Sequence, residues 1–366
     1  MKILQLTYHL TAGGAERFVV DLCNELSAIK ENEVYLVAIK DDTIPENRHY
    51  LGELSPNVNY ICLGCKKGLS LESVRKIYGV IKRVKPDIVH THTNLIPIFL
   101  PAFLLRKPKY VHTMHTLANR AGSKYFHSIE HFLYKKRVQA VTISSLNNSS
   151  YKEFYGLDNS ICINNGCPTK KTTDKFEEAR KEIELLKNDK NCPVFIHVAR
   201  YHPVKNQQLL FSVFNRLASE NHKFLLLVLG DGFEKSGLIE EIRTEKIKLL
   251  GLKQNVGDYL ACADYFVLTS KIEGLPISLI EAMSLGVVPI CTPAGGIVDV
   301  IDNKKNGYIT EDFEEESLYE YIKNATEGNS TVKKEHVIDS YINNYTMKKC
   351  AEEYHFLYKT QINSKR

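Results

Sequence analysis

Charged side chains follow several short apolar runs of this 366-residue sequence, and one pair suits the binding of a diphosphate. Arg200 is followed five residues later by Lys205 in VARYHPVKN, just past the apolar run VFIHVA. Guanidinium and ammonium groups in a loop between a strand and a helix donate charge-assisted hydrogen bonds to phosphate oxygens. Surface lysine and arginine are common, so this pair alone is equally compatible with a solvated loop.

Two glutamates frame the segment SKIEGLPISLIEAMSLG, which predicts a ligand-facing helix start. Glu273 follows the run YFVLTS, and Glu281 lies inside the helix that Pro276 opens. An ionised glutamate between apolar neighbours is unfavourable unless it is paired or solvated, although an exposed helix position is the structural alternative. First-turn N–H groups present a positive dipole to a ligand. The residues expected at this helix start are Gly274, Leu275, Ile277 and Ser278.

Two glycine pairs are placed where a strand gives way to a helix. Gly13 and Gly14 follow the first apolar run and precede Glu16, and Gly295 and Gly296 follow VVPICT. Glycine lets the backbone approach a ligand, and a helix N-terminus offers free N–H groups to an anion. Each pair is weak evidence by itself, since a tight strand–helix turn explains it equally well.

The charge of the chain is unevenly distributed. The net charge is +5, but residues 66–152 contain 16 basic and only 3 acidic side chains. Such an excess predicts an anionic partner, namely a membrane surface, a phosphorylated substrate or a nucleic acid, with a solvated basic face as the alternative. The basic residues named for this role are Lys66, Lys67, Lys82, Arg83, Lys85, Arg106, Lys107 and Lys109.

The elements that must position these residues alternate between strand and helix. The predicted strands are residues 2–8, 33–39, 57–63, 87–93, 109–115, 140–144 and 160–164, then 194–199, 223–230, 247–251, 265–270, 287–292 and 307–310. Helical patterns intervene, such as residues 16–29, 71–84, 206–220 and 276–286. This alternation predicts parallel sheets with helices on both faces. The fold class is therefore α/β, with two Rossmann-like, doubly wound domains.

A polar stretch over residues 167–191 predicts the boundary between the two domains. We expect residues 1–168 plus 349–366 in the first domain and 169–348 in the second. Open sheets of this class bind ligands outside the carboxyl ends of their strands, so we expect the two domains to face a central cleft.

Several classes of protein are disfavoured. No apolar run reaches the ~20 residues of a membrane span, and MKILQLTYHL is typical of a first strand rather than a secretory signal. Nine cysteines without a framework favour reduced thiols, and one CxxC alone is a weak indication of zinc. A dinucleotide dehydrogenase needs a GxGxxG turn that is absent here. No recognised nucleic-acid-binding module accompanies the basic segment.

Taken together, these motifs resemble the GT-B retaining glycosyltransferases of family 4, the group 1 type of bacterial surface-polysaccharide synthesis. The resemblance rests on GGAE at 13–16, R-x4-K at 200–205, E-x7-E at 273–281 and GG at 295–296. It also includes NNG at 164–166, GDG at 230–232 and LLG at 249–251. The final pattern TMKKCAEEYHFLY resembles the family's closing helix, which crosses back to the first domain.

The resemblance implies a role for each motif residue. Arg200 and Lys205 match the cations that hold the donor diphosphate, Glu281 matches the carboxylate on the ribose, and Glu273 matches the contact to the transferred sugar. Gly14 matches a loop glycine that approaches the phosphates or the acceptor. His115 matches a histidine near the anomeric centre. The resemblance makes it catalytic, together with Arg200, Lys205 and Glu273. Where the family has glutamate after the GG pair, Asp299 stands here.

The implied activity is retaining transfer of a sugar from a nucleotide-sugar, with UDP as the default nucleotide, to a lipid-linked or polysaccharide acceptor. The sequence has no Asp-x-Asp, which fits the family's metal-independent habit, so we expect neither a metal nor another cofactor. The basic residues of the first domain, with Glu16, are expected to meet a polyprenyl-diphosphate-linked acceptor or an anionic membrane surface. The mixed aromatic and basic stretch 123–137 is typical of an interfacial helix.

These features predict a cytoplasmic enzyme docked on the inner face of the plasma membrane, with no nucleic-acid partner. Two alternatives stay open: a GT-B sugar-nucleotide epimerase, and a non-catalytic module that binds sugar nucleotide as a scaffold.

Overall fold

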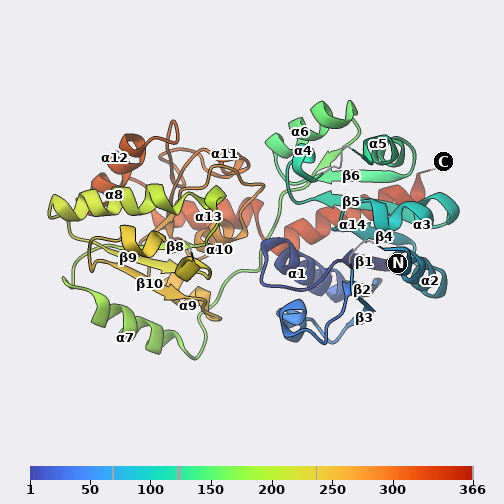
Figure 1. Ribbon diagram of the computed structural model, residues 1–366, viewed down its shortest axis with the longest axis horizontal. Coiled ribbons are helices and arrows are strands. Elements are labelled where there is room, and N and C mark those ends of the chain that lie inside the picture. The colour runs from blue at the N-terminus through green and yellow to red at the C-terminus, as the bar shows by residue number, and fades with distance from the viewer. Residues whose placement is uncertain (68–69, 122–124, 236, 365–366) are drawn as a thin grey trace. The chain divides into compact units, whose positions relative to one another are not determined.

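The computed structural model describes residues 1–67, 70–121, 125–235 and 237–364. The chain forms two compact units, Met1–Pro168 with Thr346–Arg366, and Thr169–Tyr345. Each unit is a parallel sheet with helices on both faces, as the alternating pattern predicts (Figure 1). Among the described residues, no helix has the length and apolarity that crossing a membrane requires.

The chain re-enters the first unit at Thr346, three residues before the predicted position. The Thr346 hydroxyl accepts a hydrogen bond from the Lys349 N–H at 3.3 Å and caps the last helix. The Met347 N–H donates to the Cys167 carbonyl at 2.9 Å, beside the outgoing segment. The capped start of α14 therefore sets the point at which the chain returns to the first unit. The polar residues before Thr346 made this point hard to place from the sequence.

The first unit contains seven strands and seven α-helices among its described residues. The strands are β1 (Lys2–Thr7), β2 (Glu33–Lys40), β3 (Val58–Cys65), β4 (Ile88–Thr91), β5 (Lys109–Met114), β6 (Val138–Thr142) and β7 (Ile161–Cys162). The helices are α1 (Gly14–Ala28), α2 (Leu71–Val84), α3 (Phe99–Leu104), α4 (Ala118–Ala121), α5 (His127–Lys136), α6 (Ser145–Tyr155) and α14 (Met347–Asn363).

The order of the strands in this sheet is β3-β2-β1-β4-β5-β6-β7, and every pair is parallel. Alternate residues of β1 enter different cores, as the two-residue period of a strand requires. Ile3 joins the core beneath α1 and α14, whereas Leu4 and Leu6 join the core that contains residues of α2, α5 and α6. Helices α1 and α14 pack against each other on their face (Figure 1).

The second unit contains six strands and seven α-helices among the residues described. The strands are β8 (Val194–Val198), β9 (Leu225–Leu229), β10 (Ile247–Gly251), β11 (Tyr265–Leu268), β12 (Val288–Cys291) and β13 (Tyr308–Ile309). The helices are α7 (Phe176–Leu186), α8 (Gln207–Ser219), α9 (Val256–Ala261), α10 (Ile277–Ser284), α11 (Ile297–Val300), α12 (Glu315–Thr326) and α13 (Lys334–Asn344).

The order of this second sheet is β10-β9-β8-β11-β12-β13, again parallel throughout. The chain reverses its direction of winding between β8 and β11, which are neighbours. In the first sheet the same reversal falls between β1 and β4. At such a switch point the two connecting loops leave to opposite sides and open a crevice at the carboxyl ends of the strands. Each unit therefore has one edge position suited to a ligand.

Candidate functional site

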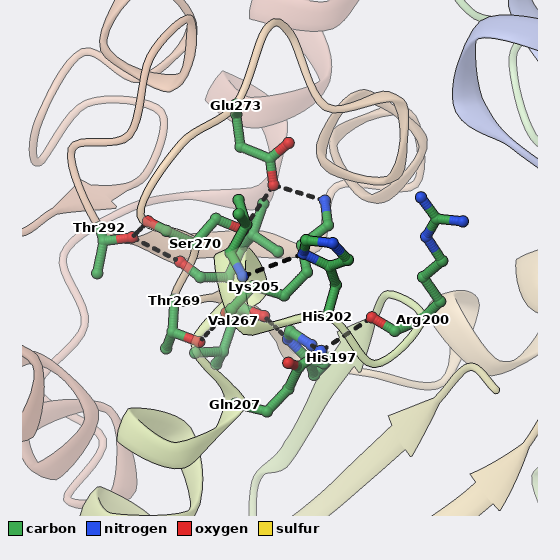
Figure 2. Close-up of polar contacts among 12 residues, drawn as sticks. His197, Arg200, His202, Lys205, Gln207, Val267, Thr269, Ser270, Glu273 and Thr292 are labelled. Atoms are coloured by element: carbon green, nitrogen blue, oxygen red, sulfur yellow. Dashed lines mark hydrogen bonds and ion pairs between the residues drawn. The ribbon is translucent and has the colours of Figure 1, made fainter. Parts of the chain in front are cut away.

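The loops after β8 and β11 bring two predicted site residues, Lys205 and Glu273, together at the switch point of the second unit. Lys205 ends a short 3₁₀ turn, Pro203–Lys205, and its Nζ lies 2.6 Å from Oε1 of Glu273 (Figure 2). The Ser270 hydroxyl donates to the same carboxylate oxygen at 2.5 Å. Both charged side chains are largely buried, with 24% of Lys205 and 11% of Glu273 exposed. The cation and the carboxylate are thus preorganised as one polar centre.

Hydroxyl groups of neighbouring strands hold the two loops in place. The Thr269 hydroxyl donates to the Lys205 carbonyl at 3.0 Å, which ties the β11 loop to the β8 loop. The Thr292 hydroxyl donates to the Ser270 carbonyl at 2.6 Å from the end of β12 (Figure 2). Sequence reasoning did not identify Ser270 or Thr292. Their positions could have indicated them, since Ser270 lies two residues after β11 and Thr292 directly follows β12, at the same edge of the sheet.

A buried histidine supports the loop that carries Arg200. The His197 Nδ1–H donates to the Val267 carbonyl at 2.9 Å, because a carbonyl oxygen can only accept. The Gln207 amide donates to the Arg200 carbonyl at 3.0 Å and lies 3.4 Å from His197 Nε2. Burial lowers the pKa of His197 to about 4, and the nearby Lys205 charge acts in the same direction. His197 is therefore a neutral structural support.

Arg200 has an exposed side chain that is available to a ligand. Within the described ranges its guanidinium forms no hydrogen bond or ion pair, and Figure 2 shows it extending beside Lys205 without a marked contact. The two predicted cations therefore differ, because Lys205 already forms an ion pair with Glu273 whereas Arg200 forms none among the described residues. An unpaired guanidinium at this edge can bind an incoming anion without first breaking a contact.

The second glycine pair brings a loop close to Glu273. Gly295 has a φ of +58°, and a Cβ at this position would lie 1.8 Å from the Glu273 carbonyl oxygen. The Gly296 N–H donates to the Gly274 carbonyl at 2.8 Å, so this amide is already engaged. The assignment of Gly295 and Gly296 to donor binding stays a prediction, although the Gly296 N–H is not free to bind an anion. The pair lets the Glu273 loop pack directly on the turn before α11.

Helix α10 starts at Ile277, one residue after Pro276, which precedes the helix instead of occupying its first turn. The N–H groups of Leu279 and Ile280 donate to the Pro276 carbonyl. Those of Ile277 and Ser278 have no acceptor among the residues that the structure describes, as the prediction of free first-turn amides requires. Buried Leu275 lies directly before this turn.

The Glu281 side chain is largely buried on α10, and the alternative of an exposed helix position is wrong. Its Oε1 lies 2.7 Å from the Nζ of Lys170, which sequence reasoning did not single out. Asp299, the residue in place of the family glutamate, is exposed near the start of α11. Its carbonyl accepts a hydrogen bond from the Tyr345 hydroxyl at 3.1 Å.

The switch point of the first unit holds the first glycine pair. Gly13 is the N-cap of α1, Gly14 is its first residue, and Glu16 lies in its first turn. A Cβ on Gly13 would lie 2.2 Å from a Glu16 carboxylate oxygen, so a larger residue here would require the Glu16 side chain to move. His9 Nδ1 lies 3.3 Å from Glu16. Although burial alone would raise the pKa of Glu16, hydrogen bonds from His9 and the Glu16 backbone hold that pKa below its usual value.

His115 follows β5 and belongs to a chain of polar contacts. Its Nε2 lies 2.9 Å from His92 Nδ1, His92 Nε2 lies 2.9 Å from Gln5 Oε1, and Gln5 Nε2 donates to the Tyr358 hydroxyl at 3.1 Å. Because Gln5 Oε1 can only accept, His92 Nε2 carries the proton and His92 Nδ1 accepts from His115 Nε2–H. The remaining nitrogen, His115 Nδ1, is then an unprotonated acceptor, and it has no partner among the described residues.

Burial keeps this histidine cluster neutral. It lowers the pKa of His115 to about 4, although the nearby Glu16 charge opposes the shift. Burial also holds the pKa of His90 and His92 well below the ordinary value. A neutral His115 cannot donate a charge-assisted hydrogen bond, but its Nδ1 can accept a hydrogen bond from a hydroxyl. The role of His115 toward a donor sugar stays a prediction, and the structure shows only that its Nδ1 is a buried acceptor without a partner among the described residues.

The basic residues predicted to meet an acceptor or a membrane are mostly exposed. The exposed ones are Lys66, Lys67, Lys82, Arg83, Lys85, Arg106 and Lys107. Lys109 differs, because its Nζ lies 3.2 Å from the Ser364 carbonyl at the end of α14. Residues 123 and 124 of the predicted interfacial stretch lie outside the described residues, and residues 127–136 form α5. Over the part of the chain that is described, no group of three or more His, Cys, Asp or Glu side chains is placed to hold a metal ion.

Comparison with known families gives two matches that follow one another along the chain. Residues 12–171 match the model of Glycosyltransferase Family 4, and residues 177–344 match that of Glycosyl transferases group 1.

Two relatives act on substrates linked to diphosphoundecaprenol. One is UDP-Gal:alpha-D-GlcNAc-diphosphoundecaprenol alpha-1,3-galactosyltransferase of Escherichia coli, 28% identical over 258 residues; the match spans 66% of each chain. The other is N-acetylgalactosamine-N,N'-diacetylbacillosaminyl-diphospho-undecaprenol 4-alpha-N-acetylgalactosaminyltransferase of Campylobacter jejuni. It is 25% identical over 336 residues, 87% of this chain and 88% of its own.

The fold recurs in solved structures. Anabaena HepE in complex with UDP-glucose superposes with a TM-score of 0.81 at 18% identity, over 98% of this chain and 100% of that chain. This likeness shows the architecture of two doubly wound units. Because the two family models follow one another along the chain and the fold agrees, the chain belongs to the group 1 glycosyltransferases with the GT-B fold.

Proposed function

We propose that this chain transfers a sugar from a UDP-linked donor to a lipid-linked or polysaccharide acceptor in cell-surface glycan synthesis. The observation that carries the proposal is the centre formed by Lys205, Glu273 and Ser270, with the unpaired Arg200 beside it. A positive group at the carboxyl edge of a parallel sheet stabilises the charge that develops on a departing nucleoside diphosphate. Both relatives act on a diphospho-undecaprenol substrate, which supports this class of acceptor.

Each residue of the centre has a distinct task in this proposal. Arg200 and Lys205 bind the diphosphate, and Glu273, which Lys205 orients, contacts hydroxyl groups of the transferred sugar. The free amides of Ile277 and Ser278 add positive dipole at the start of α10. Glu281 accepts hydrogen bonds from the ribose hydroxyls. These groups supply electrostatic stabilisation without a divalent ion, and we therefore propose metal-independent transfer.

Retention at the anomeric carbon completes the proposed reaction. The names of both relatives specify an alpha-linked product. Transfer from an alpha-linked nucleotide sugar gives that anomer only if the configuration is retained. The described residues near Lys205 include one carboxylate in contact with it, Glu273, and that carboxylate is engaged by both Lys205 and Ser270. A paired carboxylate is a poor nucleophile, so we favour front-face displacement in which the departing phosphate takes the acceptor's proton.

The experiment that tests the donor site is calorimetric titration with UDP and UDP-sugars, in EDTA and in Mg²⁺. We expect wild-type protein to bind UDP equally in both. Lys205→Met should weaken binding at least tenfold, since a charge-assisted contact to phosphate contributes about 1.5–3 kcal/mol. Lys271→Met is the matched control, because Lys271 lies exposed in the next loop. Binding that requires Mg²⁺, or that survives in Lys205→Met, would contradict the proposal. Donor binding without any sugar transfer would favour the scaffold alternative.

We further propose that the first unit docks on the inner face of the plasma membrane through a patch on α3 and α5, which pack together. Its exposed apolar residues are Leu100, Phe103, Leu104 and Phe132. Its exposed cations are Arg106, Lys107, Lys135 and Lys136. Exposed apolar side chains combined with exposed cations suit the boundary between anionic headgroups and acyl chains.

Flotation with vesicles that contain phosphatidylglycerol tests this patch. We expect salt-sensitive binding that is lost when Phe103 and Leu104 are both replaced by serine. Leu185→Ser in the second unit is the control, because Leu185 is 87% exposed on α7. Equal flotation of the two variants, or no flotation of wild-type protein, would remove the patch from the proposal.

A further inference from the structure

A lysine that no motif includes is paired with the carboxylate of Glu281. The Nζ of Lys170 lies 2.7 Å from Glu281 Oε1, and only 21% of the lysine side chain and 14% of the glutamate side chain are exposed. Lys170 lies in the polar segment that begins the second unit, 111 positions before its partner. An ion pair at an exposed position contributes little to stability. A largely buried pair fixes both side chains, because losing either partner leaves a desolvated charge.

The segment that carries Lys170 is fastened to the second unit at several points. The Lys170 N–H donates to the Ser284 hydroxyl at 3.3 Å, and the same hydroxyl donates to the Glu281 carbonyl at 2.7 Å. Three residues on, the Thr173 N–H and hydroxyl donate to the two oxygens of the Asp258 carboxylate, at 2.7 and 2.6 Å. The ammonium group of Lys170 is therefore delivered by backbone that is itself held against α10 and α9.

We propose that Lys170 is a positioning residue for the nucleotide site, holding Glu281 so that its second oxygen accepts hydrogen bonds from the ribose of a nucleoside diphosphate. This inference rests on the proposed function, which places the ribose at Glu281. A carboxylate has about four lone-pair sites, and Lys170 occupies one side at Oε1. The other oxygen stays available, and the carboxylate keeps one orientation in place of several rotamers.

A positioning lysine and a blocking lysine have opposite effects on nucleotide binding. A lysine that blocked the ribose would have to leave before the nucleotide binds, and its removal would then strengthen binding. A lysine that fixes the carboxylate lowers the conformational cost of binding, and its removal weakens recognition of the ribose hydroxyls alone. The diphosphate contacts lie in other loops, at Arg200 and Lys205. The effect should therefore depend on the ribose hydroxyls and not on the phosphates.

The test compares the binding of UDP and 2′,3′-dideoxy-UDP by calorimetry in wild-type protein, Lys170→Met, Lys170→Arg and Lys171→Met. We expect wild-type protein to prefer UDP by at least tenfold, the usual range for hydrogen bonds to a charged group. Lys170→Met should lose most of that preference while binding 2′,3′-dideoxy-UDP about as wild type does. Lys170→Arg should keep most of it. Lys171→Met, at the exposed neighbouring position, should be unchanged.

Each other outcome overturns the inference in a recognisable way. Tighter UDP binding by Lys170→Met identifies Lys170 as a blocking residue. Equal weakening of both ligands, with a lowered melting temperature, identifies a purely structural ion pair, and Lys170→Arg then shows whether charge alone restores the fold. An unchanged preference in Lys170→Met shows that Glu281 needs no positioning. Failure of wild-type protein to bind UDP, or an unchanged preference in Glu281→Gln, instead contradicts the proposed function on which the inference rests.

Discussion

Replacing Gly295 by alanine should damage the donor site by displacing the backbone of Glu273. The φ of +58° at Gly295 costs an L-residue about 1–2 kcal/mol. The added Cβ would also lie 1.8 Å from the Glu273 carbonyl oxygen, where 3.0 Å is the practical minimum. The carbonyl must therefore retreat by more than an ångström. Overpacking of that kind costs about 1–3 kcal/mol more, and the hydrogen bond from Gly296 to Gly274 is strained with it.

Gly328→Ala is the matched control for this substitution. Gly328 has a φ of +76°, and nothing lies within 4 Å of a Cβ placed there, so only the backbone penalty applies. For a unit of this size, about 1 kcal/mol lowers the melting temperature by roughly 2–4 °C. We expect Gly328→Ala to show about that shift and normal UDP binding.

Gly295→Ala should melt at least twice as far below wild type as the control and bind UDP-sugar at least tenfold more weakly, because Glu273 loses its 2.6 Å contact with Lys205. Differential scanning fluorimetry and calorimetry measure both effects. If the two variants melt together and Gly295→Ala binds the donor normally, the packing argument is refuted.

The remaining predictions concern buried polar groups. His197 has an ordinary pKa of 6.5 and a pKa of about 4 in the folded state, so below pH 6.5 the unfolded chain takes up a proton that the folded chain refuses. This proton uptake should lower the free energy of unfolding by about 3 kcal/mol between pH 6.5 and pH 4. Urea unfolding should show that His197→Asn loses less stability over the same pH range. Tyr358→Phe removes the hydroxyl that contacts Gln5 and lies 2.6 Å from His90, and should destabilise the first unit by about 1–3 kcal/mol in denaturant titrations. An unchanged unfolding midpoint would contradict it. Ser270→Ala should leave the fold intact but weaken UDP-sugar more than UDP, because the Ser270 hydroxyl orients Glu273 and not the diphosphate contacts; equal effects on the two ligands would contradict this assignment.

Periodicity and loop position in the sequence were sufficient to predict the sheets and the main polar centre. The apolar runs are strands in both units, because strands covered on both faces are almost wholly apolar. Lys205 and Glu273 lie 68 residues apart, yet both follow strands that a doubly wound sheet places side by side. Topology alone therefore predicts that they meet, and the 2.6 Å contact agrees.

Other features depend on long-range packing that no local pattern reveals. Lys170 lies in a polar segment with no periodicity, so its pairing with Glu281 could not be predicted. The relay from Tyr358 through Gln5 to the histidines requires α14 to return to the first sheet, which only the resemblance indicated. Gly295 was identified as an anion-binding turn, whereas its positive φ and close approach to Glu273 are properties of tertiary structure.

Sugar transfer measured in the presence of EDTA tests the central claim most directly. Purified protein is incubated with radiolabelled UDP-sugars and a saccharide linked to diphosphoundecaprenol, and the labelled lipid is separated by chromatography and its new linkage assigned by NMR. The account predicts an alpha-linked product from one UDP-sugar, formed equally with and without Mg²⁺ and lost in Lys205→Met. A beta-linked product, a strict requirement for a divalent ion, or full activity in Lys205→Met would contradict it.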